Sequence, residues 1–172
     1  MSKFLTKTIA LIFLLVLHTG KAFAYTDTPS EAINLNNIGV NKLNKGDYEG
    51  AISKLEASMK IAPNYEMARS NYSIALNNYG LASQLEPLKA LHLFERALYF
   101  DFDNITTQHN CNGIIRMLSL DPKDPFVRID LGSKAIARGD LIGAVTEFKM
   151  ASNLIVIQQE ESDEEKKDDK NN

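Results

Sequence analysis

Residues 35–63 read LNNIGVNKLNKGDYEGAISKLEASMKIAP, and a later stretch of the chain repeats their spacing. In the first stretch Gly39 is followed by small, large apolar and small residues at gaps of twelve, four and three positions. The same order of residue sizes begins again at Gly132, 93 positions later. The two sets are Gly39, Ala51, Leu55 and Ser58, and Gly132, Ala144, Phe148 and Ala151, with a partial copy at Ala90, Phe94 and Ala97. Repetition of this kind is typical of an array of helical units.

The first stretch predicts a helix hairpin over residues 30–63. Apolar residues keep helical spacing until Lys45-Gly46-Asp47 breaks the pattern. A second stretch of helical spacing follows and stops at Pro63, because proline cannot continue a helix. Gly39 and Ala51 are expected where the two helices touch, since larger side chains would hold the helices apart.

This first unit resembles the tetratricopeptide repeat (TPR). The family pattern places a large residue and a Leu-Gly step in the first helix, Ala-x3-Phe in the second helix and a closing proline at these intervals. The matching residues are Leu35, Ile38, Gly39, Gly46, Asp47, Tyr48, Ala51, Leu55 and Pro63. The resemblance implies an all-α superhelical stack of helix hairpins, and it says little about function.

Applied to the whole chain, the pattern predicts a TPR-like α-solenoid of three helix hairpins plus one inserted lone helix. In the second unit Ser73 stands where the pattern prefers glycine, and the extra length is expected in a long turn over Gly80–Pro87. The lone helix is interpreted as a degenerate repeat that has lost its first helix. The predicted organisation is a signal peptide at 1–24, a linker at 25–29, repeat one at 30–63, repeat two at 64–103, the lone helix at 104–123, repeat three at 124–158 and an acidic disordered tail at 159–172.

The first 24 residues have the features of a secretion signal. Lys3 and Lys7 precede the apolar run Ile9–Leu17, and Ala22-Phe23-Ala24 supplies small residues at the cleavage spacing. The apolar run is shorter than the roughly 20 residues that a membrane span needs. We therefore expect cleavage after Ala24, an exported protein in the periplasm or the medium, and no stable membrane insertion; an uncleaved anchor is the weaker alternative.

The charge balance and the single cysteine narrow the classes of function. Residues 25–172 carry 16 basic and 22 acidic side chains, so nucleic acid is not an expected partner. Cys111 has no second cysteine to pair with, and its apolar-periodic surroundings predict a buried thiol. His109 lies two positions away, and on a helix such residues point to different sides, so the pair is a poor metal site. We expect neither a metal nor a cofactor.

The resemblance also implies where a partner would lie. In this family the first helix of each hairpin lines the inner wall of the superhelix, and partners usually bind there. The corresponding groove positions in this chain are Asn36, Asn37, Val40, Asn44, Ser70, Asn71, Ile74, Asn78, Ile129, Asp130 and Ser133. Carboxamides can pair with the main chain of an extended peptide, so a peptide or protein segment is the expected partner. Asn37 and Asn71 have a second interpretation as bridges between neighbouring helices.

A second candidate surface is expected at the end of the array. The apolar run Leu154, Ile155, Val156 and Ile157 lies in the last predicted helix, and no further helix is predicted to cover it. This run is either a face that docks a partner or a second copy, or a small patch shielded by the acidic tail.

The sequence shows no arrangement of residues with the pattern of an active site, and His92 is predicted to be a partly buried structural histidine. The leading hypothesis is a non-catalytic adaptor that holds a peptide segment or protein loop in its groove. The alternative is a structural subunit of an envelope or secretion assembly that docks through its last helix.

Overall fold

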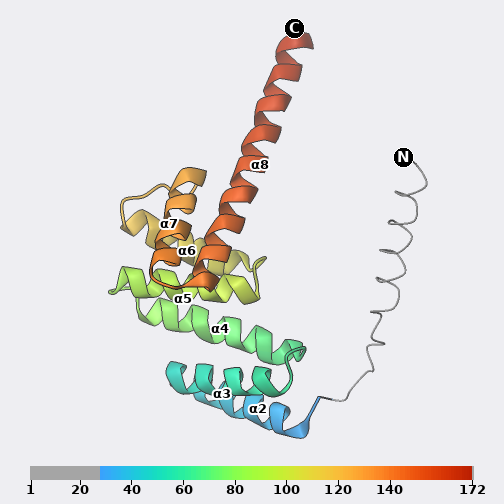
Figure 1. Cartoon of the computed structure of the whole chain (residues 1–172), viewed down its shortest axis with the longest axis vertical. Helices are drawn as coiled ribbons and strands as arrows, with labels where there is room; N and C mark the ends of the chain where they lie inside the picture. The colour runs from blue at the N-terminus through green and yellow to red at the C-terminus, as the bar shows by residue number, and fades with distance from the viewer. Residues whose placement is uncertain (1–27, 172) are drawn as a thin grey trace, which may run out of the picture.

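The computed structural model describes residues 28–171, and this part of the chain is all-helical. Its seven α-helices are α2 (Ser30–Asn44), α3 (Tyr48–Ile61), α4 (Glu66–Ala82), α5 (Pro87–Phe100), α6 (Ile105–Met117), α7 (Pro125–Ala137) and α8 (Leu141–Asn171). They are stacked in chain order, with α2 and α3 at one end and α7 and α8 at the other (Figure 1). The predicted signal peptide at 1–24 lies outside the described residues.

Six of these helices form three hairpins, α2–α3, α4–α5 and α7–α8, whose helices are joined by short turns. Gly46 and Gly139 lie in the turns of the first and third hairpins with φ of 76° and 80°, the left-handed region that glycine adopts easily. The side chains of Asp47 and Asp140 cap α3 and α8, because each accepts a hydrogen bond from a main-chain N–H of the first helical turn. The helix break predicted at Lys45-Gly46-Asp47 is confirmed, and the third hairpin has a turn of the same kind.

A glycine of the first helix lets the two helices of a hairpin approach closely. A Cβ atom on Gly39 would lie 2.6 Å from Cγ of Leu55, and one on Gly132 would lie 2.7 Å from Cε1 of Phe148. Both distances are shorter than ordinary van der Waals contact, so any larger residue would force Leu55 or Phe148 to shift. The close contact expected at Gly39 is confirmed, and the third hairpin repeats it.

In the second hairpin, the expected long turn over Gly80–Pro87 is wrong. Helix α4 continues past Gly80, and residues 83–86 alone connect it to α5. A Cβ atom on Gly80 would lie 2.6 Å from Cε1 of Phe94, so this glycine provides the close approach. Ser73 occupies the position where the repeat pattern prefers glycine, and its hydroxyl donates a hydrogen bond to a main-chain oxygen of α5 at 3.0 Å. The prediction failed because a glycine is equally suited to a turn and to a close helix contact.

Two glycine-to-alanine substitutions are expected to change stability in opposite directions. Gly113 lies in α6, and a Cβ atom there has nothing within 4 Å, so Gly113→Ala should stabilise the protein by about 1 kcal/mol through helix propensity. Gly80→Ala should destabilise it by about 1–3 kcal/mol, because Phe94 must move. Urea unfolding measures both free energies, and a stabilising Gly80→Ala would contradict the close contact.

Helix α6 takes the position of a first helix, whereas the sequence predicted that the degenerate repeat at 104–123 had lost its first helix. It packs against α5 as α4 packs against α3. Asn110 of α6 donates a hydrogen bond to Asn77 of α4 at 2.9 Å, just as Asn71 of α4 donates one to Asn36 of α2 at 2.8 Å. Pro122 follows α6, but a proline can end either helix of a hairpin, so it does not identify α6 as the second helix of a repeat.

Two apolar clusters lie on either side of α5, which contributes to both. The first cluster joins α3, α4 and α5 through Ala51, Leu55, Tyr72, Ala75, Leu76, Leu93 and Ala97. The second cluster joins α5, α6 and α7 through Ala90, Leu91, Phe94, Leu98, Cys111, Ile114, Ile115 and Leu131. Cys111 is fully buried, as predicted, and burial raises the pKa of its thiol to about 12.

Helix α8 is 31 residues long, runs antiparallel to α7 and projects far past the start of α7 (Figure 1). The tail at 159–172, predicted to be disordered, is therefore helical as far as Asn171. Glutamate and lysine are favourable helix formers, a property that the prediction from charge alone left out. Figure 1 also shows α8 steeply inclined to α2–α5, so the third hairpin does not continue the side-by-side stacking of the first two.

Candidate functional site

The third hairpin exposes a set of large apolar side chains that we call the open face. On each helix these residues recur at intervals of three and seven positions, which places them on one side of the helix. The open face consists of Phe126, Ile129 and Ile136 on α7 and Val145, Phe148 and Ile155 on α8. Phe126 is 76% exposed, and Ile136 and Val145 are each 52% exposed, so these side chains contact solvent over much of their surface.

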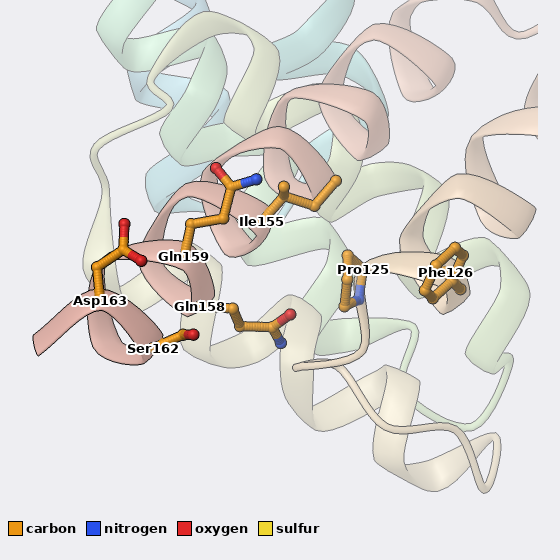
Figure 2. Close-up of a pocket in the computed structure, with 7 residues that line it drawn as sticks. All are labelled: Pro125, Phe126, Ile155, Gln158, Gln159, Ser162 and Asp163. Carbon is orange, nitrogen blue, oxygen red and sulfur yellow. The ribbon is translucent and has the colours of Figure 1, made fainter. Parts of the chain in front are cut away.

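A hollow of about 680 Å³ lies at one end of the open face. Its walls are formed by Pro125, Phe126, Ile155, Gln158, Gln159, Ser162 and Asp163. Figure 2 shows that Pro125 and Phe126 come from the start of α7 and that the other five side chains come from α8. The hollow forms where α7 begins and α8 continues alone, so it extends the open face toward the polar end of α8.

The equivalent face of the first hairpin is covered by α4. Positions in the first hairpin correspond to positions in the third at an offset of 93. Leu43 and Ile52, which correspond to Ile136 and Val145, pack against the apolar cluster that α4 shares with α3 and α5. The third hairpin therefore has the same kind of face, but none of the helices in residues 28–171 takes the place of α4 there.

Several predicted groove asparagines bond to one another within the array. Asn36 is 1% exposed, accepts a hydrogen bond from Asn71 at 2.8 Å and donates one to Asn37 at 3.3 Å. Asn78 accepts a hydrogen bond from Asn77 at 3.3 Å. The expectation that Asn36 is an exposed groove residue is wrong, because its carboxamide is enclosed between α2 and α4. The bridging interpretation fits Asn71.

The remaining predicted groove residues lie on two separate parts of the molecule. Asn37 and Asn44 on α2 and Ser70 and Ile74 on α4 are exposed, while Val40 and Asn78 are half-buried. Ile129, Asp130 and Ser133 are exposed on α7, in the inclined third hairpin, and Ile129 is part of the open face.

The apolar run predicted as a docking face covers only one end of the open face. Leu154 is half-buried, whereas Ile155, Val156 and Ile157 are exposed. Ile157 lies on the opposite side of α8 from Phe148, since positions nine apart on a helix differ by about half a turn. The sequence analysis predicted Ile129 only as a groove residue, and it missed Phe126 and Ile136 on α7 and Val145 and Phe148 on α8. The repeat offset of 93 positions could have identified most of these residues, because α4 covers the corresponding residues of the first hairpin.

Three ionisable residues are fully buried where the third hairpin meets α5 and α6. The Nη1 atom of Arg128 on α7 donates hydrogen bonds to both carboxylate oxygens of Glu147 on α8, at 3.0 and 3.1 Å. Glu95 on α5 is equally buried, and its Oε1 atom has no hydrogen-bond partner among the described residues. Burial, together with the negative charge of Glu147, raises the pKa of Glu95 to about 8. Glu95 therefore carries a proton at neutral pH.

The same junction places His92, Glu95 and Asp140 within reach of a common metal ion, with ligand atoms within 4.8 Å of one another. Arg138 already lies between the two carboxylates, with its Nη2 atom 3.2 Å from Glu95 Oε2 and 3.3 Å from Asp140 Oδ2. The amino end of α8 adds a second positive neighbour. These charges oppose the binding of a cation.

The sequence offered no partner for His92, but its Nδ1 atom lies 2.7 Å from Asp140. This contact joins α5 to the start of α8.

Among residues 28–171, no helix combines the length and the apolar character that crossing a lipid bilayer requires. Comparison with known proteins yields neither a matching family model nor a matching curated protein.

Proposed function

We propose that the chain is a TPR-like α-solenoid that acts outside the cytoplasm as a non-catalytic protein-binding module and docks its partner on the open face. The observation that carries this proposal is the exposure of six large apolar side chains on two adjacent helices. Exposed apolar surfaces that span neighbouring elements mark interaction sites on soluble proteins. The repeated residue spacing and the all-helical fold support the repeat architecture, and the signal-like sequence at 1–24 supports export.

A second candidate function is the binding of an extended peptide along α2 and α4. Asn37, Asn44, Ser70 and Ile74 favour it, because they offer exposed polar groups beside an aliphatic side chain. This function ranks below docking on the open face, since the carboxamide of Asn36 is enclosed between the helices and is not offered to a ligand.

Val145→Asp is expected to abolish capture of the partner, because it places a charge in the middle of the open face. The test is chemical crosslinking of the tagged protein in its source cell, followed by mass spectrometry of the captured proteins. We expect at least about a tenfold loss of the principal captured protein, the equivalent of roughly 1.4 kcal/mol of binding free energy. Val145 is 52% exposed, so the substitution leaves the apolar core intact.

The matched control is Leu88→Asp on α5, which is 72% exposed and lies outside the open face. Its capture should equal that of the parent protein. The double variant Asn37→Ala with Asn44→Ala separates the two candidate functions. If this variant loses the captured protein while Val145→Asp keeps it, the partner binds along α2 and α4 and the open-face proposal is wrong.

A further inference from the structure

We propose that the open face receives an amphipathic helix of a partner protein, which lies where α4 lies on the first hairpin and runs antiparallel to α8. This inference rests on the proposed function and specifies the structural element that docks. It follows from the internal repeat, because residues 28–171 contain one copy of the face with its helix in place and one copy that no helix of this range covers.

The occupied copy defines the shape of the missing helix. In the first hairpin α4 presents Tyr72, Ala75 and Leu76 to the cluster that it shares with α3, and all three are buried. Their spacing of three and four positions forms one apolar stripe on a helix. Leu55 of the covered face and Phe148 of the open face are both large side chains that contact the glycine of their hairpin. The open face therefore offers a similar surface to a similar stripe.

The orientation of the missing helix also follows from the occupied copy. Residues 62–65 connect α3 to α4, so α4 begins beside the end of α3 and runs back along it. The end of α3 at Ile61 corresponds to Leu154 on α8. A helix in the place of α4 would begin beside Leu154 and end near Leu141, at the start of α8.

The two faces differ in polarity at one central position, and this difference indicates the chemistry of the partner. On the first hairpin Asn36 bonds to Asn71 of α4. The corresponding residue on the open face is Ile129, which is 37% exposed and offers no hydrogen bond. A buried polar group without a partner is costly, so the docked helix should carry an apolar residue at the position of Asn71.

The charge on the projecting part of α8 indicates what precedes the docked helix. Glu160, Glu161 and Glu164 are exposed on α8 just beyond the open face. The residues ahead of the docked helix would pass beside them, so basic residues are favoured there. The same acidic side chains repel the anionic surface of a lipid bilayer, which favours a protein helix over a membrane as the occupant.

A designed peptide tests this proposal directly. The probe has the sequence of residues 64–82, which includes all of α4, with Asn71→Leu and with two lysines added at its amino end. The control peptide carries the further changes Tyr72→Asp and Leu76→Asp, which remove the apolar stripe. Fluorescence anisotropy measures binding of each labelled peptide to the full protein, and circular dichroism measures the helix content gained on mixing. We expect the probe to bind and to gain helix, and the control to bind at least about tenfold more weakly.

Variants of the protein locate the bound peptide. Val145→Asp should weaken binding of the probe by about tenfold or more, whereas Leu88→Asp should leave it unchanged. Glu160→Lys with Glu161→Lys should weaken it by roughly two- to fivefold through the lysines of the probe. Equal binding of the probe and the control peptide, or binding without a gain of helix, would overturn the inference.

The outcomes separate this inference from the proposed function. If capture in the cell depends on Val145 but the peptide does not bind, the helical occupant is wrong and docking on the open face stands. If capture is insensitive to Val145→Asp, the proposed function fails as well. If light scattering finds a dimer that Val145→Asp dissociates, a second copy of the chain occupies the face and the inference of a separate partner is wrong.

Discussion

Arg128→Met is expected to lower the free energy of unfolding by about 3–5 kcal/mol, one of the largest effects of any single substitution in the chain. Arg128 and Glu147 are buried to 1% and 0% side-chain exposure, and the guanidinium neutralises the carboxylate through two hydrogen bonds. Arg128 also donates a hydrogen bond to the main-chain oxygen of Pro122 at 3.2 Å and one to the side chain of Asn112. Methionine fills a similar volume but leaves the carboxylate of Glu147 buried without the cation that is hydrogen-bonded to it.

Urea unfolding of the parent, the two single variants and the double variant Arg128→Met with Glu147→Met measures this effect as a thermodynamic cycle. The double variant should recover most of the lost stability, because replacing both partners of a buried ion pair by apolar residues is often neutral. A single Arg128→Met change that costs less than about 1 kcal/mol would show that water reaches Glu147 and that the junction is open.

Glu95→Gln is expected to stabilise the protein at neutral and alkaline pH and to flatten the dependence of its stability on pH. The pKa of Glu95 is raised from its ordinary value of 4.5 to about 8, mainly by burial and then by the charge of Glu147. Arg138 and Arg128 act in the opposite direction, and Asp140 adds to the shift. The folded protein therefore holds a proton on Glu95 over a pH range in which the unfolded chain has lost it.

The sign of the effect follows from this difference in proton binding. The stability contributed by Glu95 is complete below about pH 4.5 and falls as the pH rises toward about 8, with a slope of about 1.4 kcal/mol per pH unit. Glutamine does not titrate, so the advantage of Glu95→Gln should grow between about pH 5 and pH 8 and then stay constant.

Thermal and urea unfolding across that pH range measure the expected divergence between the variant and the parent. The matched control is Glu160→Gln, which makes the same chemical change at an exposed position of α8, away from the buried junction. Parallel stability curves for the parent and Glu95→Gln would mean that Glu95 is ionised in the folded protein at neutral pH.

The sequence predicted the helix hairpins well because local signals determine them. The turn glycines Gly46 and Gly139, and the small residues opposite Leu55 and Phe148, act within a hairpin and recur at the offset of 93. The position of α6 was not predictable in this way. Whether a helix is the first or the second of a repeat depends on which neighbours it touches, and the bond between Asn110 and its partner on α4 appears only in three dimensions.

The candidate site was predicted only in part for a related reason. The run at Leu154–Ile157 is apolar in sequence and could be found without a structure. Phe126 and Ile136 have the same helical spacing as core residues, so the sequence does not distinguish them from buried positions. They belong to a surface because no helix of residues 28–171 covers them, which is a property of the whole stack. Asn36 is the opposite case. An asparagine suggested an exposed position, but the side chain of Asn36 is buried beside Asn71 of α4.

The buried thiol of Cys111 has a chemical consequence for the lifetime of the protein. Oxidants and foreign thiols react with the thiolate of an accessible cysteine, and Cys111 is both fully enclosed and far from ionising at neutral pH. The contact between α5, α6 and α7 must separate before its sulfur can react. Every molecule with an oxidised Cys111 has therefore undergone this local opening at least once. The fraction of molecules in which Cys111 is oxidised thus increases with the number of times that the contact between α5, α6 and α7 has opened.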